Sequence, residues 1–458
     1  MKNTKNIEEV KQAVWNVGNK YREQFESVYI VTIWIDMIYL HAMKPEYASI
    51  LEQAADDLKK MTDQLRVVAN SDEVELAVIN DFSDSIRRIL LPRTTDDNRL
   101  QVFNGIREDG LELIHIQYDR IALIKILQQM NIDFGPQSNG QIATPNQIND
   151  LMVRIAEVHL KNGGQVTVYD PAAGTGGSLI AMRRMLDSSR EVTLVGQEIN
   201  TEAYMRCAMM LNLINDDTTT HRLINNDVFN EKAENKNLRA DIVISDPPYS
   251  VKWAPNRTLL KTKPYSEIGV LPPKSKADFA FVLHGLEHLK DNGIMVIQLP
   301  HGVLFRGAAE AKIRQYLLER NYIDAVIGLP ANLQYETSIP TMLLVLRKGR
   351  SGQDVLFIDA SDEVEKLRPN NILPELSVKK ITDSYKRFSN IDQYAHVATH
   401  SEIVSNDYNL NIPRYVDKFI PPEVIPVSKL EEQLSVLNEK LSNFETVTQD
   451  IMSKYKRE

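Results

Sequence analysis

From residue 140 onward, short apolar runs alternate with stretches of helical periodicity. Strands that alternate with helices are typical of an α/β fold in which helices cover both faces of a mainly parallel sheet. The pattern predicts strands at residues 165–169, 192–197, 241–245, 294–299, 323–328, 342–346 and 355–359. Ligands of such sheets bind outside the carboxyl ends of the strands. The residues that follow these runs are therefore the candidates for a functional site.

Residues 1–135 have helical periodicity throughout and are predicted to form an N-terminal helical domain. The apolar run Val28 to Leu40 is interrupted by Thr32 and Asp36 and is shorter than the ~20 residues of a membrane span, so we expect a buried helix there. Further helical patterns cover residues 46–68 and 111–130. The apolar positions of the first pattern recur at intervals of three and four and are Ile7, Val10, Val14, Val17, Tyr21 and Phe25.

The C-terminal segment is predicted to be one more helix. Ser428 to Glu431 forms a capping box after Pro421, Pro422 and Pro426. Apolar residues then follow heptad spacing at Leu430, Leu434, Leu437, Leu441 and Phe444. Such a helix either packs on its own chain or pairs with another subunit. The sequence therefore predicts three parts: residues 1–135, a central domain at 136–420, and a tail helix at 421–458.

Charge and cysteine content limit the possible functions. The 458 residues include one cysteine, Cys207, so a disulfide within the chain and a cysteine-based metal cluster are both excluded. No metal ion and no membrane association is expected, and the chain fits a reducing cytoplasm. The net charge of −9 is unfavourable for holding DNA, because phosphate neutralisation dominates nucleic-acid affinity. Binding to DNA would require a local basic surface or a basic partner.

Asp246-Pro247-Pro248-Tyr249 directly follows the predicted strand at residues 241–245. A carboxylate and a backbone carbonyl can together accept both hydrogens of a planar exocyclic amine. The two prolines hold the carbonyls in place, because each fixes φ and removes a donor. Tyr249 offers a face on which a base can stack. The tetrapeptide therefore suits methyl transfer to an amine nitrogen, although a strand-ending turn with two prolines would have the same sequence.

A glycine loop, Asp170 to Gly177, follows the first predicted strand and precedes a helix. Its glycines permit tight turns and close approach to a ligand. Glu198 closes the second strand and can accept from ribose hydroxyls, and Asp227, about thirty residues later, can accept from an adenine amine. No P-loop occurs in the chain. The set predicts a pocket for an adenosine without phosphates, namely S-adenosylmethionine. Glu198 could instead cap a helix, and Asp227 could be a turn residue.

These residues resemble the gamma group of DNA adenine-N6 methyltransferases, and most closely the modification subunits of type I restriction–modification systems. The likeness covers residues 140–348, with a further segment at 402–417. Residues 170–177 resemble motif one, and Asp246 to Tyr249 resembles motif four. Other segments that match the family are Leu299 to Phe305, residues 329–333 with Tyr335 and Ile339-Pro340, and residues 407–411 with Arg414-Tyr415.

The resemblance implies a Rossmann-like methyltransferase sheet that uses S-adenosylmethionine. The implied catalytic residues are Asp246, Pro247, Pro248 and Tyr249. The implied cofactor-binding residues are Thr144, Pro145, Asp170, Ala172, Gly174, Thr175, Gly176, Gly177, Glu198 and Asp227. A target adenine would be extruded from the duplex, with Tyr249 on one face and Tyr335 on the other. The chain departs from the family pattern in three places: Asp246 replaces the usual Asn, Ile142-Ala143 replaces aromatics, and Gln334 replaces a Phe.

Residues 250–277 carry six basic residues and one acidic residue, Glu267. This segment follows the tetrapeptide directly, so we expect it to lie over the DNA backbone and to become ordered on binding, with Lys261 and Lys263 contacting phosphates. A solvated surface loop is the alternative.

After the last predicted strand, too few residues remain for a second β-rich, sequence-reading domain. The expected partners are therefore double-stranded DNA, a separate specificity subunit, a second copy of this chain, and a restriction or translocase subunit. Alternative functions are cytosine-N4 methylation of DNA, methylation of RNA or of a protein glutamine, and a scaffold subunit without turnover.

Overall fold

The computed structural model describes residues 20, 26–90, 96–114, 120–134, 144–160, 163–214, 216–230, 235–334, 338–368, 370–419 and 426–455. By its contacts the chain divides into two compact units, Met1–Val416 and Asp417–Glu458. Within the described ranges, no helix has both the length and the apolar character needed to cross a bilayer. The periodic pattern predicted for residues 7–25 lies outside the described residues, apart from Lys20.

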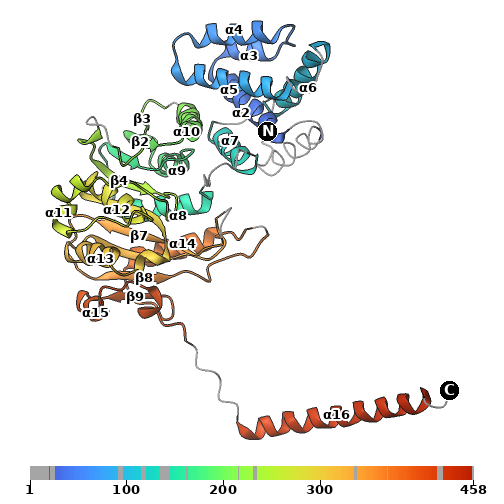
Figure 1. Ribbon diagram of the computed structural model, residues 1–458, viewed down its shortest axis with the longest axis vertical. Coiled ribbons are helices and arrows are strands. Elements are labelled where there is room, and N and C mark those ends of the chain that lie inside the picture. The colour runs from blue at the N-terminus through green and yellow to red at the C-terminus, as the bar shows by residue number, and fades with distance from the viewer. Residues whose placement is uncertain are drawn as a thin grey trace. The chain divides into compact units, whose positions relative to one another are not determined.

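A nine-stranded sheet forms the centre of the first unit, as far as the structure describes it, and its strand order is β3-β2-β1-β4-β5-β7-β6-β8-β9 (Figure 1). The strands from β3 to β5 are parallel to their neighbours. β7 is antiparallel to both β5 and β6, whereas β8 is parallel to β6 and β9 is antiparallel to β8. The strand bounds are β1 (Val166–Asp170), β2 (Val192–Glu198), β3 (Thr219–Asn225), β4 (Ala240–Ser245), β5 (Leu289–Pro300), β6 (Ile323–Gly328), β7 (Thr341–Arg347), β8 (Val355–Asp359) and β9 (Ala395–Ala398).

All seven predicted strands are present, and β3 and β9 are additional. These two strands lie at the edges of the sheet. Most residues of β3 are polar and none is fully buried, and β9 has only four residues. An edge strand packs against few neighbours, so its sequence need not carry the apolar run by which the central strands are recognised. In β4, Ile242 and Ile244 enter one core cluster and Val243 enters another, because alternate side chains point to opposite faces. Both faces of the sheet are therefore buried.

Helices cover both faces of this sheet (Figure 1). Those that follow the N-terminal region are α8 (Asn146–Glu157), α9 (Gly177–Met185), α10 (Thr201–Ile214), α11 (Tyr265–Ile268), α12 (Asp278–Glu287), α13 (Ala309–Glu319), α14 (Glu375–Arg387) and α15 (His400–Ser405), with short 3-10 helices η2 (Arg257–Lys261), η3 (His301–Leu304) and η4 (Ile412–Arg414). α9 begins at the end of the glycine loop, and α8 begins directly after Thr144-Pro145. These two helix starts bring the predicted cofactor segments to the same edge of the sheet.

The N-terminal region is helical, as predicted. Its helices are α2 (Ser27–Met43), α3 (Pro45–Leu51), α4 (Leu58–Ala69), α5 (Glu73–Leu90), α6 (Asp96–Ile114) and α7 (Arg120–Phe134). α2 contains the apolar run at residues 28–40, and it is buried along most of its length. The single helical pattern predicted at residues 46–68 is two helices, because the carboxylate of Asp57 accepts from the Lys60 amide at 2.8 Å and starts α4. The pattern predicted at residues 111–130 falls on the end of α6 and on α7.

One buried ionic group joins the N-terminal helices to α10. Arg206 on α10 donates to Asp36 on α2 at 2.6 Å and to Asp81 on α5 at 2.9 Å. Asp36 is fully buried and Arg206 is 2% exposed. Burial raises the pKa of Asp36, and the positive charge of Arg206 acts against this rise. The same core cluster contains apolar residues of α2 and of the sheet, so the N-terminal helices and the sheet share one core.

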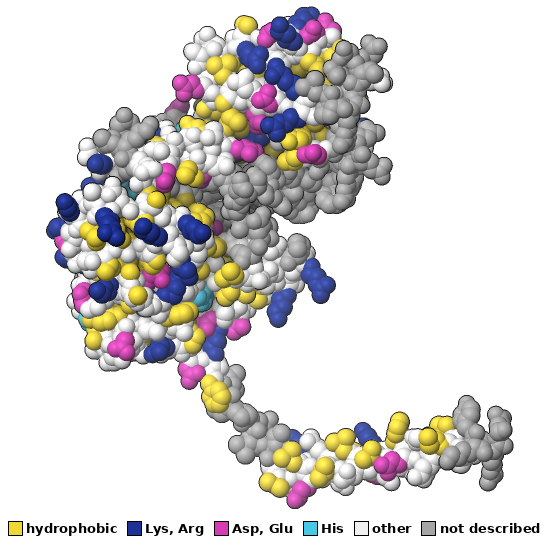
Figure 2. Space-filling view, in the orientation of Figure 1, with side chains coloured by type: hydrophobic (Ala, Val, Ile, Leu, Met, Phe, Trp, Pro, Cys, Tyr) yellow, Lys and Arg dark blue, Asp and Glu magenta, His cyan; other side chains and the backbone are white. Residues whose placement is uncertain are grey.

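The second unit consists mainly of α16 (Val427–Tyr455). The five heptad residues predicted from the sequence all lie on this helix, and each is between 47% and 72% exposed. Figure 2 shows apolar side chains along this helix. The predicted helix is therefore confirmed, and its pairing with another subunit stays a prediction.

Candidate functional site

The carboxyl ends of β3, β2, β1 and β4 bring four acidic residues to one edge of the sheet. Asp170 and Glu198 are the last residues of β1 and β2, and Asp246 directly follows β4. Asp227 follows β3 by two residues, and its carboxylate accepts from the Phe229 amide at 2.9 Å. Neighbouring parallel strands end side by side, so residues that are far apart in the sequence become neighbours here.

The glycine loop is bound to Glu198. The Gly174 amide donates to Glu198 Oε2 at 2.9 Å, and the Asn200 amide donates to Oε1 at 2.8 Å. Gly174 and Gly176 have φ values of 53° and 87°, a region that favours glycine. A Cβ at Gly176 would lie 2.8 Å from the Cys207 sulfur, whereas one at Gly174 would meet nothing within 4 Å. Gly174 therefore faces open space in which a ligand could approach the backbone.

Asp170 is buried beneath this loop and is 1% exposed. Its carboxylate accepts from the Ala172 amide at 3.0 Å. Burial raises the pKa of Asp170 to about 7, and the nearby charges of Glu198 and Asp246 act in the same direction. Asp170 thus holds the turn that begins the glycine loop.

The tetrapeptide Asp246 to Tyr249, predicted to be catalytic, forms a hydrogen-bonded network around the Asp246 carboxylate. Tyr249 donates its hydroxyl to Oδ1 at 2.6 Å. Oδ2 accepts from the Thr144 hydroxyl at 2.7 Å and from Gln334 Nε2 at 3.2 Å. Burial raises the pKa of Asp246, and the three donors act against this rise. Burial and the adjacent Asp246 raise the pKa of Tyr249 well above its usual value, so Tyr249 stays protonated and donates.

Asn149, which the sequence patterns did not indicate, connects the start of α8 to the glycine loop. It is 2% exposed, and its Nδ2 donates to the Thr144 carbonyl at 3.3 Å. Its Oδ1 accepts from the Ser178 hydroxyl at 3.0 Å. A Cβ at Gly177 would lie 2.7 Å from Asn149 Nδ2. Thr144-Pro145 and the glycine loop are thus held against each other, as expected for two parts of one cofactor site.

These segments enclose a cavity of about 50 Å³. It is lined by one residue of α7, by residues of the predicted cofactor segments and by Asp246: Gln128, Thr144, Asn146, Asn149, Asp170, Ala172, Ala173, Gly174, Thr175, Gly177, Ser178 and Asp246. Pockets that hold a whole small ligand are larger, about 300 Å³ or more. The cavity can therefore enclose only part of a cofactor, and Glu198 and Asp227 lie outside its lining.

The basic segment after the tetrapeptide is folded in this structure. Trp253 donates its indole N–H to the Pro273 carbonyl at 2.9 Å and packs against Phe229 with ring centroids 5.0 Å apart. Lys261 ends η2 and is exposed, and Lys263 is 83% exposed and pairs with Glu267 at 2.7 Å. Figure 2 shows Lys and Arg side chains gathered over the region of α11, α12 and α13. Tyr335, the other predicted substrate residue, lies outside the described residues.

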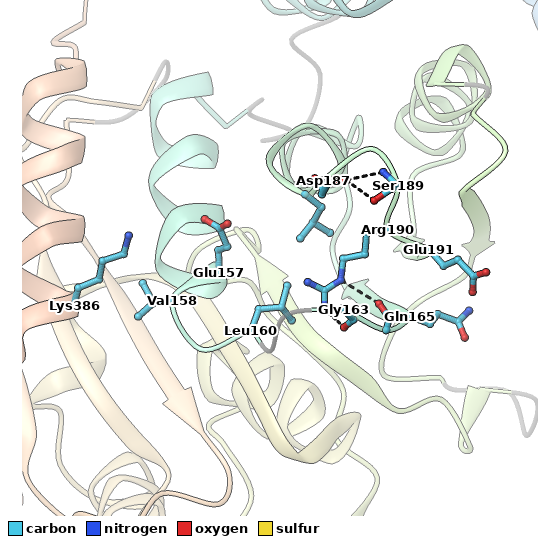
Figure 3. Close-up of a pocket in the computed structure, with 12 residues that line it drawn as sticks. Glu157, Val158, Leu160, Gly163, Gln165, Asp187, Ser189, Arg190, Glu191 and Lys386 are labelled. Atoms are coloured by element: carbon cyan, nitrogen blue, oxygen red, sulfur yellow. Dashed lines mark hydrogen bonds between the residues drawn. The ribbon is translucent and has the colours of Figure 1, made fainter.

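A second cavity, of about 740 Å³, lies at the opposite edge of the sheet, near the amino ends of β1 and β2 (Figure 3). Arg190 donates there to the carbonyls of Gly163 at 2.8 Å and Gly164 at 3.1 Å. Lys386, from the end of α14, lies across the cavity from these residues (Figure 3). None of the predicted site residues lines this cavity.

Residues 126–421 match the protein family described as N-6 DNA Methylase. This chain is a member of that family. The methylase subunit of the type I restriction enzyme MpnII from Mycoplasma pneumoniae is 33% identical over 332 residues, which cover 70% of this chain and 61% of that protein. The methylase subunit of MjaVII from Methanocaldococcus jannaschii is 29% identical over 426 residues, or 89% of this chain and 69% of that protein. The chain thus spans 61% and 69% of the length of these two relatives.

Solved structures confirm the predicted fold. The methyltransferase subunit of a type I restriction–modification system from Streptococcus thermophilus has a TM-score of 0.73 and 32% identity, and the match covers 90% of this chain and 100% of that one. A modification subunit of a putative type I restriction enzyme from Vibrio vulnificus YJ016 has a TM-score of 0.64 at 16% identity, with 91% and 99% covered. The Rossmann-like fold of S-adenosylmethionine-dependent methyltransferases is therefore confirmed, and S-adenosylmethionine is the cofactor that this family implies. The roles of individual residues stay predictions.

Proposed function

We propose that this chain transfers a methyl group from S-adenosylmethionine to N6 of adenine in DNA, as the modification subunit of a type I restriction–modification complex in the cytoplasm. One observation carries the proposal: Asp246 and the glycine loop line the same cavity. A carboxylate that can orient an amine thus lies beside the segment that suits the methyl donor. Thr144 and Pro145, the glycine loop, Glu198 and Asp227 would hold the cofactor.

The residues of the chain supply orientation and electrostatics in the proposed reaction. The target base is extruded from the duplex, and the amine donates one hydrogen to Asp246 Oδ1 and the other to the Pro247 carbonyl. The nitrogen lone pair then points out of the ring plane. S-adenosylmethionine, when bound, supplies an electrophilic methyl carbon on its sulfonium. Tyr249 would stack on one face of the extruded base, and Tyr335 would lie on the other face. Positioning of this kind accounts for a large part of the barrier reduction in such transfers.

Nucleoside analysis of modified DNA tests the proposal. The chain is produced together with a candidate specificity subunit from the same organism, supplied with S-adenosylmethionine labelled in the methyl group, and given duplex DNA. We expect the label in N6-methyladenine. Label in N4-methylcytosine would instead support cytosine as the target, and label in RNA or protein would identify another substrate class. Cofactor binding without transfer to any of these substrates would identify a scaffold subunit.

The basic segment at residues 250–277 is proposed to contact the DNA backbone. Charge reversal of Lys261 and Lys263 to Glu should weaken DNA binding. It should also make the fall of log affinity with log salt less steep, by about 1 unit of slope for each phosphate that is no longer neutralised. The matched control is the reversal of Lys386 and Arg387, an exposed Lys–Arg pair at the end of α14. DNA affinity measured between low and moderate salt is the readout. An unchanged slope in the Lys261/Lys263 variant would show that this segment does not bind DNA.

We propose that α16 pairs with the specificity subunit, in an assembly that also contains DNA, a second copy of this chain and a restriction or translocase subunit. Its heptad row is exposed, whereas knobs-into-holes packing would bury it. Leu437→Glu with Leu441→Glu should abolish co-purification with the specificity subunit, because two charges would enter an apolar seam. Ser435→Glu with Ser442→Glu adds the same charge, one heptad apart, outside the row. If the leucine variant still co-purifies like the serine variant, another surface binds the specificity subunit.

A further inference from the structure

Gln334 lies in the loop after β6 and contacts two members of the catalytic tetrapeptide. It is 2% exposed. Nε2 donates to Asp246 Oδ2 at 3.2 Å and to the Tyr249 hydroxyl oxygen at 3.0 Å. Both hydrogens of the amide nitrogen are thus used within one network, since Tyr249 itself donates to Asp246 Oδ1 at 2.6 Å. The three side chains form a closed ring of hydrogen bonds.

Chemistry fixes the direction of this amide. A flipped amide would place Oε1, which is only an acceptor, against a carboxylate oxygen that is also an acceptor. In the observed orientation, Oε1 is buried and has no hydrogen-bond partner among the described residues. A buried acceptor without a partner disfavours a fold, so the hydrogen bonds made by Nε2 outweigh this cost. The backbone is also held, because Asn370 Nδ2 donates to the Gln334 carbonyl at 2.6 Å.

The network determines which carboxylate oxygen of Asp246 can accept a further hydrogen bond. Each carboxylate oxygen can accept about two hydrogen bonds. Oδ2 accepts from both Thr144 and Gln334, whereas Oδ1 accepts, within the described part of the chain, from Tyr249 alone. One acceptor position therefore stays open, on Oδ1. Without Gln334, the carboxylate could rotate and Tyr249 would lose the donor to its oxygen.

We propose that Gln334 is a positioning residue that orients the Asp246 carboxylate and the Tyr249 hydroxyl, so that Oδ1 faces the target amine. The proposal rests on the proposed function and extends it to a residue that stands where the family has an aromatic side chain. Gln334→Met keeps the size of the side chain and removes both donors. Gln334→Glu keeps the shape and places a second carboxylate against Asp246, so that the pair retains a proton more strongly.

The experiment measures the titration of the Asp246 carboxyl by carbon-13 NMR in protein labelled at aspartate, with the signal assigned from Asp246→Asn. Among the residues that the structure describes, the titratable groups that face Asp246 are Tyr249 and Asp170, and both are unchanged in the variants. The pKa of Asp246 should rise in Gln334→Met and rise further in Gln334→Glu. The matched control is Gln298→Met: Gln298 is also fully buried, donates to Thr341 at 2.8 Å, and has an Oε1 without a partner among the described residues. It should leave the Asp246 titration unchanged.

Methyl transfer is measured on the same proteins. We expect Gln334→Met to lower kcat about 10- to 100-fold, with little change in the KM for S-adenosylmethionine, and Gln334→Glu to move the acidic limb of the rate profile to higher pH. A wild-type titration curve for Asp246 in Gln334→Met would overturn the proposal, as would an equal shift in the Gln298 control. If the shifts occur but the wild-type protein methylates no DNA, the proposed function fails while the positioning role stands.

Discussion

Replacement of Asp246 with alanine is expected to lower the rate of methyl transfer about 100- to 1,000-fold while S-adenosylmethionine still binds. The substitution removes the proposed acceptor for the target amine and leaves the donors of Thr144, Tyr249 and Gln334 without their shared acceptor. The glycine loop is bound through Glu198 and does not depend on this carboxylate. Single-turnover transfer and calorimetric binding of the cofactor separate the two effects. An alanine variant that transfers at the wild-type rate would exclude the proposed mechanism.

The matched control for this change is Asp246→Asn, which retains one acceptor oxygen and the residue usual in the family. It should transfer far faster than the alanine variant. In the wild-type protein, burial raises the pKa of Asp246, and only the ionised carboxylate accepts from every donor around it. The wild-type rate should therefore fall as the pH falls through this raised pKa. The asparagine variant does not titrate, so this acidic limb should be absent from its profile.

Replacement of Arg206 with leucine is expected to lower the free energy of unfolding by about 3–5 kcal/mol. The substitution leaves the fully buried Asp36 without the guanidinium that lies 2.6 Å away. Denaturant unfolding followed by fluorescence measures the loss. Burial raises the pKa of Asp36 to about 8 even beside Arg206, and the pKa rises further when Arg206 is removed, so the loss should be smallest below pH 8 and should grow as the pH rises above it.

Two further variants control this measurement. Asp36→Asn combined with Arg206→Leu removes the unpaired charge and should recover much of the stability. Arg239→Leu removes an exposed arginine that donates to the carbonyls of Lys236 and Leu238, and should change stability by about 0.5 kcal/mol or less. An equal loss in Arg206→Leu and Arg239→Leu would mean that the buried ionic group contributes little.

Residues that follow buried strands were the easiest to predict. Asp246 and Glu198 lie directly at the ends of apolar runs, and a parallel sheet brings all such ends to one edge. The glycine loop was recognisable because positive φ values at Gly174 and Gly176 require glycine. The antiparallel direction of β7 was not predictable in the same way, because an apolar run has the same pattern in either direction.

Gln334 and Asn149 had no role predicted from the sequence, because their partners are distant along the chain. Each acts through a partner that is far away in the chain: Gln334 through Asp246, 88 residues before it, and Asn149 through Ser178, 29 residues after it. An isolated amide carries no local pattern that reveals such a partner. The role of Arg206 was not predictable for the same reason. A single arginine in an apolar helix has the same sequence pattern whether it is exposed to solvent or paired with a carboxylate on another helix.

The sequence correctly predicts that the heptad row of α16 lies on a helix. It does not predict which surface covers that row. Leu437 and Leu441 have the same spacing whether the helix packs on its own chain or on another protein. Spacing of this kind specifies which face of the helix is apolar, but it carries no information on the surface that covers this face.

The shared core between α2 and the sheet limits how this protein can be divided for laboratory work. A fragment that starts near residue 136 would retain Arg206 and the apolar side of α10 but lose Asp36, Asp81 and the helices that cover them. Such a fragment would expose Arg206 together with the apolar surface around it, and it should aggregate during expression. Activity assays on an isolated catalytic half would then report on misfolding and not on chemistry, so the helices before residue 135 belong in any sample used for enzymology.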